Sequence, residues 1–114
     1  MAMNDDLKAS VPIVRVFRAR ARPGKEKELA EKLSKTSPTV VKGKPGFLGY
    51  FAGGPAKSGS RDFLFISMWR HFPALKKTFG DSWRDSHLPP GYAEIIEEHS
   101  IEHYELTDEL VKSR

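Results

Sequence analysis

Apolar and basic residues alternate from Pro12 to Ala21, where the chain reads IVRVFRARA after the proline. A period of two places successive side chains on opposite faces and is typical of a β-strand. Apolar runs of similar length recur at residues 47–53 (FLGYFAG), 62–70 (DFLFISMWR) and 99–106 (HSIEHYEL). Turn-forming and polar segments separate these runs, so the pattern predicts four strands.

Helical spacing of apolar residues predicts two helices between the strands. The first covers residues 23–36, because Pro23 suits a first helical turn and the following residues place Leu29 and Leu33 on one side. The second opens at Pro73. Its apolar positions are Phe72, Leu75, Phe79 and Trp83. Residues 36–46 contain two prolines and two glycines and predict a connection, and residues 88–98 predict a short third helical piece.

The strand at residues 62–70 is apolar on both faces. Phe63, Phe65 and Trp69 alternate with Leu64, Ile66 and Met68. Two helices can cover only one face of a four-stranded antiparallel sheet, so the other face needs a cover of its own. A second copy of the chain is the cover that we expect, and the sequence therefore predicts a homodimer.

Length and composition predict one α+β domain with the order β-α-β-β-α-β. The chain has 114 residues, which fits a single domain over residues 11–107, with flexible tails at 1–10 and 108–114. It contains no cysteine, which excludes disulfides, zinc-thiolate sites and a cysteine nucleophile. No signal-peptide pattern or apolar run of membrane-spanning length is present, so we expect a cytoplasmic protein with no membrane partner.

Several segments, taken in order, resemble the antibiotic biosynthesis monooxygenase family. They are VRVFRARARPGKEKELAEKL, KPGFLGYF, DFLFISMWRHFPALKKTF, HLPP and SIEHYEL, and together they extend over residues 12–106. The resemblance implies a ferredoxin-like subunit with both helices on one face of its sheet. It further implies that two subunits join their sheets into a dimeric α+β barrel, and that each keeps a cleft between sheet and helices.

Activities within the family differ, so the resemblance alone leaves the function open. Some members oxidise aromatic polyketides or quinols with O₂ and without metal, flavin or other cofactor. A related branch binds and degrades haem through an Asn on the first strand, a Trp on the second helix and a His after it. Here Phe17 and Phe79 occupy the Asn and Trp positions, and only the histidine is kept, as His87. Haem degradation is therefore not expected, while haem binding through His87 stays open.

A cofactor-free oxygenase needs a base, an apolar pocket and a donor for the substrate anion. His87 is the candidate base, because an unperturbed imidazole titrates near neutral pH. Arg15 shares its strand face with Phe17 and is the candidate oxyanion donor. The candidate pocket residues are the aromatics Phe17, Phe65, Trp69, Phe79 and Trp83.

Other chemistries fail on spacing. His99 and His103 share a strand face but lie about 13 Å apart at about 3.3 Å per residue, too far for one metal ion.

The net charge of +4 raises the question of nucleic-acid binding, but residues 62–70 lack the glycines of an RNA-recognition signature. The sequence thus predicts a cofactor-independent monooxygenase acting on an aromatic or quinol-type small molecule. The alternative is a non-catalytic small-ligand or haem-binding protein, and nucleic-acid binding is less favoured.

Overall fold

The structure, a computed structural model, describes residues 11–107. Strands β1 (Ile13–Ala21), β2 (Phe47–Gly53), β3 (Asp62–Trp69) and β4 (Ile96–Glu105) form one antiparallel sheet in the order β2-β3-β1-β4. This confirms the ferredoxin-like α+β fold expected from the sequence. The tails predicted at 1–10 and 108–114 lie outside the described residues, and the domain boundaries stay a prediction.

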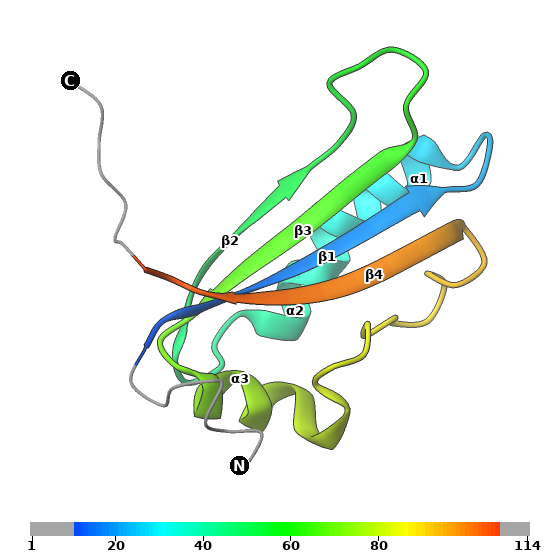
Figure 1. The fold of residues 1–114 in the computed structure, drawn as a ribbon. Coiled ribbons are helices and arrows are strands. Elements are labelled where there is room, and N and C mark those ends of the chain that lie inside the picture. The colour runs from blue at the N-terminus through cyan, green and yellow to red at the C-terminus, as the bar shows by residue number, and fades with distance from the viewer. Residues whose placement is uncertain (1–10, 108–114) are drawn as a thin grey trace.

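The helices lie on one face of the sheet. Behind the strands in Figure 1, α1 (Glu26–Glu31), the π-helix η2 (Lys32–Thr36) and α2 (Ser37–Val41) follow one another without a break. Helix α3 (Phe72–Phe79) and the short 3₁₀-helix η3 (Gly80–Ser82) lie at the lower end of the sheet in the same view. Within the described residues, no helix is both long and apolar enough to cross a membrane.

The first helical segment runs five residues past its predicted end at Thr36, because Ser37–Val41 is helical. Pro38 was expected to stop the helix, since proline has no N–H to donate. The π-helical turn just before it changes the hydrogen-bond ladder, and the Ser37 N–H donates to the Lys32 carbonyl. Proline therefore stands in the first turn of α2, where a missing N–H is tolerated.

The short helical piece predicted at residues 88–98 is wrong. The chain makes turns there, and β4 already begins at Ile96. Pro89 and Pro90 cannot supply helical N–H donors, and Gly91 takes a φ of 91°, which ends any right-handed helix. The result is an irregular segment between η3 and β4, drawn in yellow in Figure 1.

The core lies between the sheet and the helical layer. Alternate residues of β1, beginning with Ile13 and Phe17, point towards the helices, where Leu29 and Leu33 are buried against them. The indole of Trp69 is fully buried in this layer. Period-two alternation thus assigns the face of each β1 residue correctly.

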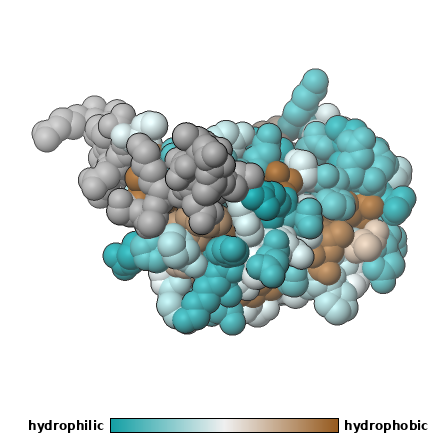
Figure 2. Space-filling view, turned by 60° about the horizontal axis from the view of Figure 1, so that its bottom comes forward, coloured by the Kyte–Doolittle hydropathy of each residue, from teal (hydrophilic) through white to brown (hydrophobic). Residues whose placement is uncertain are grey.

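The opposite face of the sheet has no helix over it. Phe51 and Ile66 are paired across β2 and β3 on this face, and Phe51 is 61% exposed. Tyr104 on β4 is 49% exposed. Figure 2, which brings the α3 end of the molecule forward, shows hydrophobic surface in separate patches among hydrophilic residues.

Candidate active site

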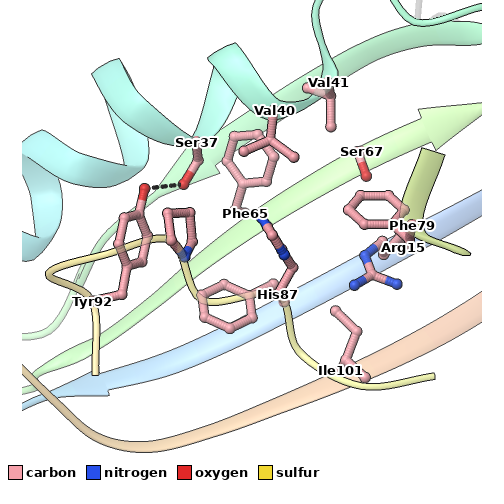
Figure 3. A pocket seen from close by; sticks show the side chains of 12 residues that line it. Arg15, Ser37, Val40, Val41, Phe65, Ser67, Phe79, His87, Tyr92 and Ile101 are labelled. Carbon is pink, nitrogen blue, oxygen red and sulfur yellow. Dashed lines mark hydrogen bonds between the residues drawn. The ribbon is translucent and has the colours of Figure 1, made fainter. Parts of the chain in front are cut away.

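A cleft lies between the sheet and the helices, where the resemblance implied one. Its lining comes from β1, β3, β4, the first helical segment, α3 and the irregular segment before β4. The lining residues are Arg15, Phe17, Ser37, Val40, Val41, Phe65, Ser67, Phe79, His87, Pro89, Tyr92 and Ile101. In Figure 3, Ser37 and Tyr92 stand at one end, Arg15 and Phe79 at the other, and His87 between them.

The cleft is narrow inside. Its volume is about 430 Å³ with the solvent at its mouth included, but the enclosed interior space is only about 40 Å³. By the same kind of measure, an apolar cavity of about 150 Å³ holds one benzene ring. A ring-sized ligand must therefore displace side chains at the rim, where Phe79 is half-buried and His87 is exposed.

Arg15 is the charged residue of the cleft, and it is only 4% exposed. Its Nη1 donates to the carbonyl oxygen of Trp83 at 2.5 Å, and its Nη2 donates to the carbonyl oxygen of Asp85 at 3.0 Å. The ring of Phe79 covers the guanidinium, with 3.8 Å from Cζ to the ring centroid. Neutral oxygens and an aromatic face thus fix the guanidinium in place.

Among the described residues, no carboxylate forms an ion pair with Arg15. Burial lowers the pKa of Arg15 to about 10, and the more distant carboxylate of Asp85 opposes that shift. The guanidinium is still protonated at neutral pH, so a positive charge stays in a largely apolar cleft. Such a charge favours an anionic ligand.

His103 is a further hydrogen-bond partner of Arg15. Its Nε2 lies 3.0 Å from Nη1 of Arg15, and a guanidinium can only donate, so Nε2 is the acceptor and the imidazole is neutral. Burial lowers the pKa of His103 to about 4, and the charge of Arg15 adds to that shift. No group of three or more His, Asp or Glu side chains that could hold a metal ion is found in residues 11–107.

Three hydroxyl groups also line the cleft. At one end, Tyr92 Oη donates a hydrogen bond of 3.0 Å to the carbonyl oxygen of Lys32, in the π-helical turn. Tyr92 Oη also lies 2.7 Å from Ser37 Oγ, so both hydroxyl groups have hydrogen-bond partners within the protein. Ser67 is 2% exposed and stands opposite Arg15 in the β1–β3 register. Its Oγ accepts a hydrogen bond of 2.9 Å from Trp69 Nε1.

His87 enters the cleft from the irregular segment. Its exposed ring lies 6.3 Å from the ring of Phe79, centroid to centroid. An exposed imidazole at the mouth can exchange protons with solvent while it faces a bound ligand. His87 thus lines the cleft, and its role as a proton acceptor stays a prediction.

Of the other residues proposed from the sequence, Arg15, Phe17, Phe65 and Phe79 also line the cleft. Trp69 and Trp83 lie outside the lining. Trp69 acts on the cleft through its hydrogen bond to Ser67, and Trp83 offers its backbone carbonyl to Arg15. A ligand-binding role for these residues stays a prediction.

Sequence reasoning missed the remaining residues of the cleft lining. They are Ser37, Val40, Val41, Ser67, Pro89, Tyr92 and Ile101. Period-two alternation did hold a signal for Ser67 and Ile101, because both share the helix-facing side with Phe17. Nothing comparable marks Ser37 or Tyr92, which reach the cleft through the unexpected helix α2 and the irregular segment.

Haem does not fit the cleft as its residues lie. Phe17 and Phe79, at the positions where the haem-degrading branch has its Asn and Trp, place rings along the cleft. The interior holds about 40 Å³, so a porphyrin would have to displace far more of these side chains than a single aromatic ring does.

Solved structures with the same fold come from several bacteria. SO0527 from Shewanella oneidensis has a TM-score of 0.68 at 19% identity, covering 89% of this chain and 97% of its own. A variant of SnoaB, a cofactor-independent oxygenase from Streptomyces nogalater, has a TM-score of 0.65 at 13% identity, covering 89% and 98%. The heme-degrading protein Rv3592 from Mycobacterium tuberculosis has a TM-score of 0.61 at 20% identity, covering 90% and 99%.

These identities are low, so the structural likeness establishes the fold and not the reaction. No curated protein matches the sequence significantly. The family model for antibiotic biosynthesis monooxygenase matches residues 12–86, from β1 through α3 to the start of the segment that carries His87. The chain therefore belongs to the antibiotic biosynthesis monooxygenase family.

Proposed function

We propose that this protein is a cofactor-independent monooxygenase that oxidises an aromatic or quinol-type small molecule in the cleft. The observation that carries the proposal is Arg15, a buried cation with no carboxylate partner among the described residues, at one end of an aromatic-lined cleft. A buried charge that no carboxylate contacts directly costs folding free energy. A substrate anion would offset that cost when it binds.

Arg15 would stabilise the oxyanion of the deprotonated substrate. Donors that are already in place before the charge develops lower the barrier more than donors that must reorganise. The bonds to the Trp83 and Asp85 carbonyls and the Phe79 ring support this role, because they hold the guanidinium without neutralising it.

His87 would accept the proton that leaves the substrate carbon. The resulting carbanion passes one electron to O₂, and the substrate radical and superoxide combine into a carbon–oxygen bond. The peroxide then takes up protons and loses water. For a methylene substrate the balance is R₂CH₂ + O₂ → R₂C=O + H₂O, so O₂ supplies one oxygen atom to each product and the substrate supplies all the electrons.

The test is oxygen uptake by metal-free protein on a panel of quinols and anthrones. We expect His87→Ala to lose turnover and to keep the fold. His99→Ala is the matched control, since His99 is also exposed and is not part of the cleft lining. Full turnover in His87→Ala with a competent substrate would remove His87 from the mechanism.

A homodimer is part of the proposal. The uncovered sheet face, with Phe51, Ile66 and Tyr104, supports it, because an exposed apolar sheet face of this kind is usually buried against another sheet. Sedimentation should give twice the monomer mass, and a monomer at micromolar concentration would refute the dimer. A cytoplasmic location stays a prediction from the sequence.

A second candidate is a non-catalytic protein that binds a small ligand in the same cleft. Absence of oxygen uptake together with saturable binding of a ring compound would select it. A haem titration followed by absorbance tests the haem-binding form of this candidate. A saturable Soret shift that disappears in His87→Ala would support haem binding, against the poor fit of the cleft.

A further inference from the structure

Ser67 presents a hydrogen-bond donor that the protein does not use. Its oxygen accepts from Trp69 Nε1, and an indole nitrogen can only donate, so the hydroxyl proton of Ser67 needs a different acceptor. Within residues 11–107 no such acceptor is present. The side chain is 2% exposed and lines the cleft. A buried donor without an acceptor is costly, and in a binding site it marks a place for a ligand acceptor.

The other hydroxyls of the cleft do not share this feature. Tyr92 donates to the Lys32 carbonyl, and Ser37 and Tyr92 are bonded to each other. Ser67 differs from them because its oxygen accepts a hydrogen bond from the indole of Trp69, while its hydroxyl proton is available to a ligand in the cleft.

We propose that Ser67 is a specificity-determining residue that donates a hydrogen bond to a substrate oxygen, a ring carbonyl or an ionised ring hydroxyl. The inference deepens the proposed function and rests on it for the nature of the ligand as a ring compound. Trp69 is a positioning residue, because it acts only through Ser67. Both residues lie on β3, two positions apart on the same face, which fixes their relative geometry.

The register also predicts how the substrate is oriented. Ser67 and Arg15 are directly paired across β3 and β1, so two donors and no acceptor side chain stand side by side on the floor of the cleft. The neighbouring floor positions are apolar, with Phe65 paired to Phe17. The oxygenated edge of the ring therefore lies over the Arg15–Ser67 pair, and its hydrocarbon edge lies over the Phe17–Phe65 pair.

Two ligands that differ by one oxygen test the inference, 1-naphthol and naphthalene. Their affinities are measured by equilibrium dialysis under argon, so that no oxidation can occur. The wild-type protein should bind 1-naphthol more tightly than naphthalene, and Ser67→Ala should reduce this preference by about tenfold. The affinity for naphthalene should not change, since naphthalene has no oxygen to accept a hydrogen bond from Ser67.

A second pair of variants tests the hydroxyl at constant side-chain shape, and the naphthalene affinity of each variant reports whether its cleft is intact. Ser67→Thr and Ser67→Val have the same shape, both suit a strand, and they differ in the hydroxyl alone. We expect Ser67→Thr to keep the preference for 1-naphthol and Ser67→Val to lose it.

Three results would overturn the role of Ser67. They are no preference in the wild-type protein, a preference that survives in Ser67→Ala or Ser67→Val, and an equal loss of affinity for both ligands. Oxygen uptake in air is measured separately. If no compound supports uptake while the Ser67-dependent preference is present, the monooxygenase proposal fails and the inference on Ser67 stands.

Discussion

The two faces of β1 use arginine in opposite ways. Arg18 and Arg20 point to the uncovered face, where Arg18 lies 3.7 Å from a Glu102 oxygen and Arg20 lies 2.9 Å from an Asp62 oxygen. Arg15 points to the helix-covered face and has carbonyl oxygens, His103 and an aromatic ring as neighbours. The same residue type on the same strand is thus paired with carboxylates where water reaches it and left without one where water is largely excluded.

This difference indicates that the exposed arginines of β1 serve solubility and that the buried Arg15 serves function. An exposed arginine with a carboxylate neighbour adds little to stability, because water and salt screen the pair. A buried arginine that no carboxylate contacts directly costs folding free energy, so we expect it to have a use other than stability. Under the proposed function, that use is the binding of an anionic ligand in the cleft beside Arg15.

The largest effect on stability should come from the core between the helices and the covered face of the sheet. Trp69→Ala removes a fully buried indole and also leaves Ser67 Oγ without its donor. We expect the free energy of unfolding to fall by about 3–5 kcal/mol. Urea denaturation measures it, and a loss below about 1 kcal/mol would show that the indole is not part of a packed core.

The charge of Arg15 is tested next. Arg15→Gln keeps polarity and removes the charge, so the affinity for 1-naphthoate should fall by about 10- to 100-fold while that for naphthalene stays the same. Arg18→Gln is the matched control from the other face, with an expected change within about twofold. Equal losses in both variants would mean that only net charge matters, and the contrast between the two faces would fail.

Acid should destabilise the fold through His103. Its pKa is about 4 in the folded chain, below the ordinary value of 6.5, so the unfolded chain binds the proton more readily between these values. Stability should therefore fall as pH decreases from about 6.5 to about 4, by no more than about 1.4 kcal/mol per pH unit from this group.

His103→Asn should flatten the corresponding part of the pH curve, and the difference between wild type and variant is the quantity to measure. Thermal unfolding at several pH values gives both curves. Parallel curves over the whole window would mean that His103 is not held neutral beside Arg15.

The smallest effect on stability is expected from a substitution on the uncovered face of the sheet. Arg18→Gln breaks the exposed pair with Glu102 and should change the free energy of unfolding by less than about 1 kcal/mol. High salt should reduce even this difference. A loss of 2 kcal/mol or more, on the order of what a buried pair contributes, would place this pair in a protected environment.

The fold was predictable because strand faces follow a strict period of two. Arg15 and Phe17 were assigned to one face from their spacing alone, and the register confirms it. The helical segment past Thr36 was not predictable in this way, since Pro38 normally ends a helix and only the π-helical turn accommodates it.

The cleft was predictable only in part. Its floor follows from strand parity, but its other walls come from α2 and from the segment with Tyr92, whose path depends on tertiary packing. Sequence reasoning also expected Trp69 and Trp83 to line the pocket, and both act from behind the lining through a hydrogen bond or a backbone carbonyl. Spacing assigns a side chain to a face, but it does not say which neighbour stands between that side chain and the ligand.

The most direct test of the account is an oxidation of an anthrone by metal-free protein in isotopically labelled O₂. We expect the quinone product to carry one labelled oxygen atom, with water receiving the other, and we expect Arg15→Gln to slow the reaction by at least about tenfold. Product oxygen that comes from unlabelled water, or a rate no faster than without protein, would contradict the account.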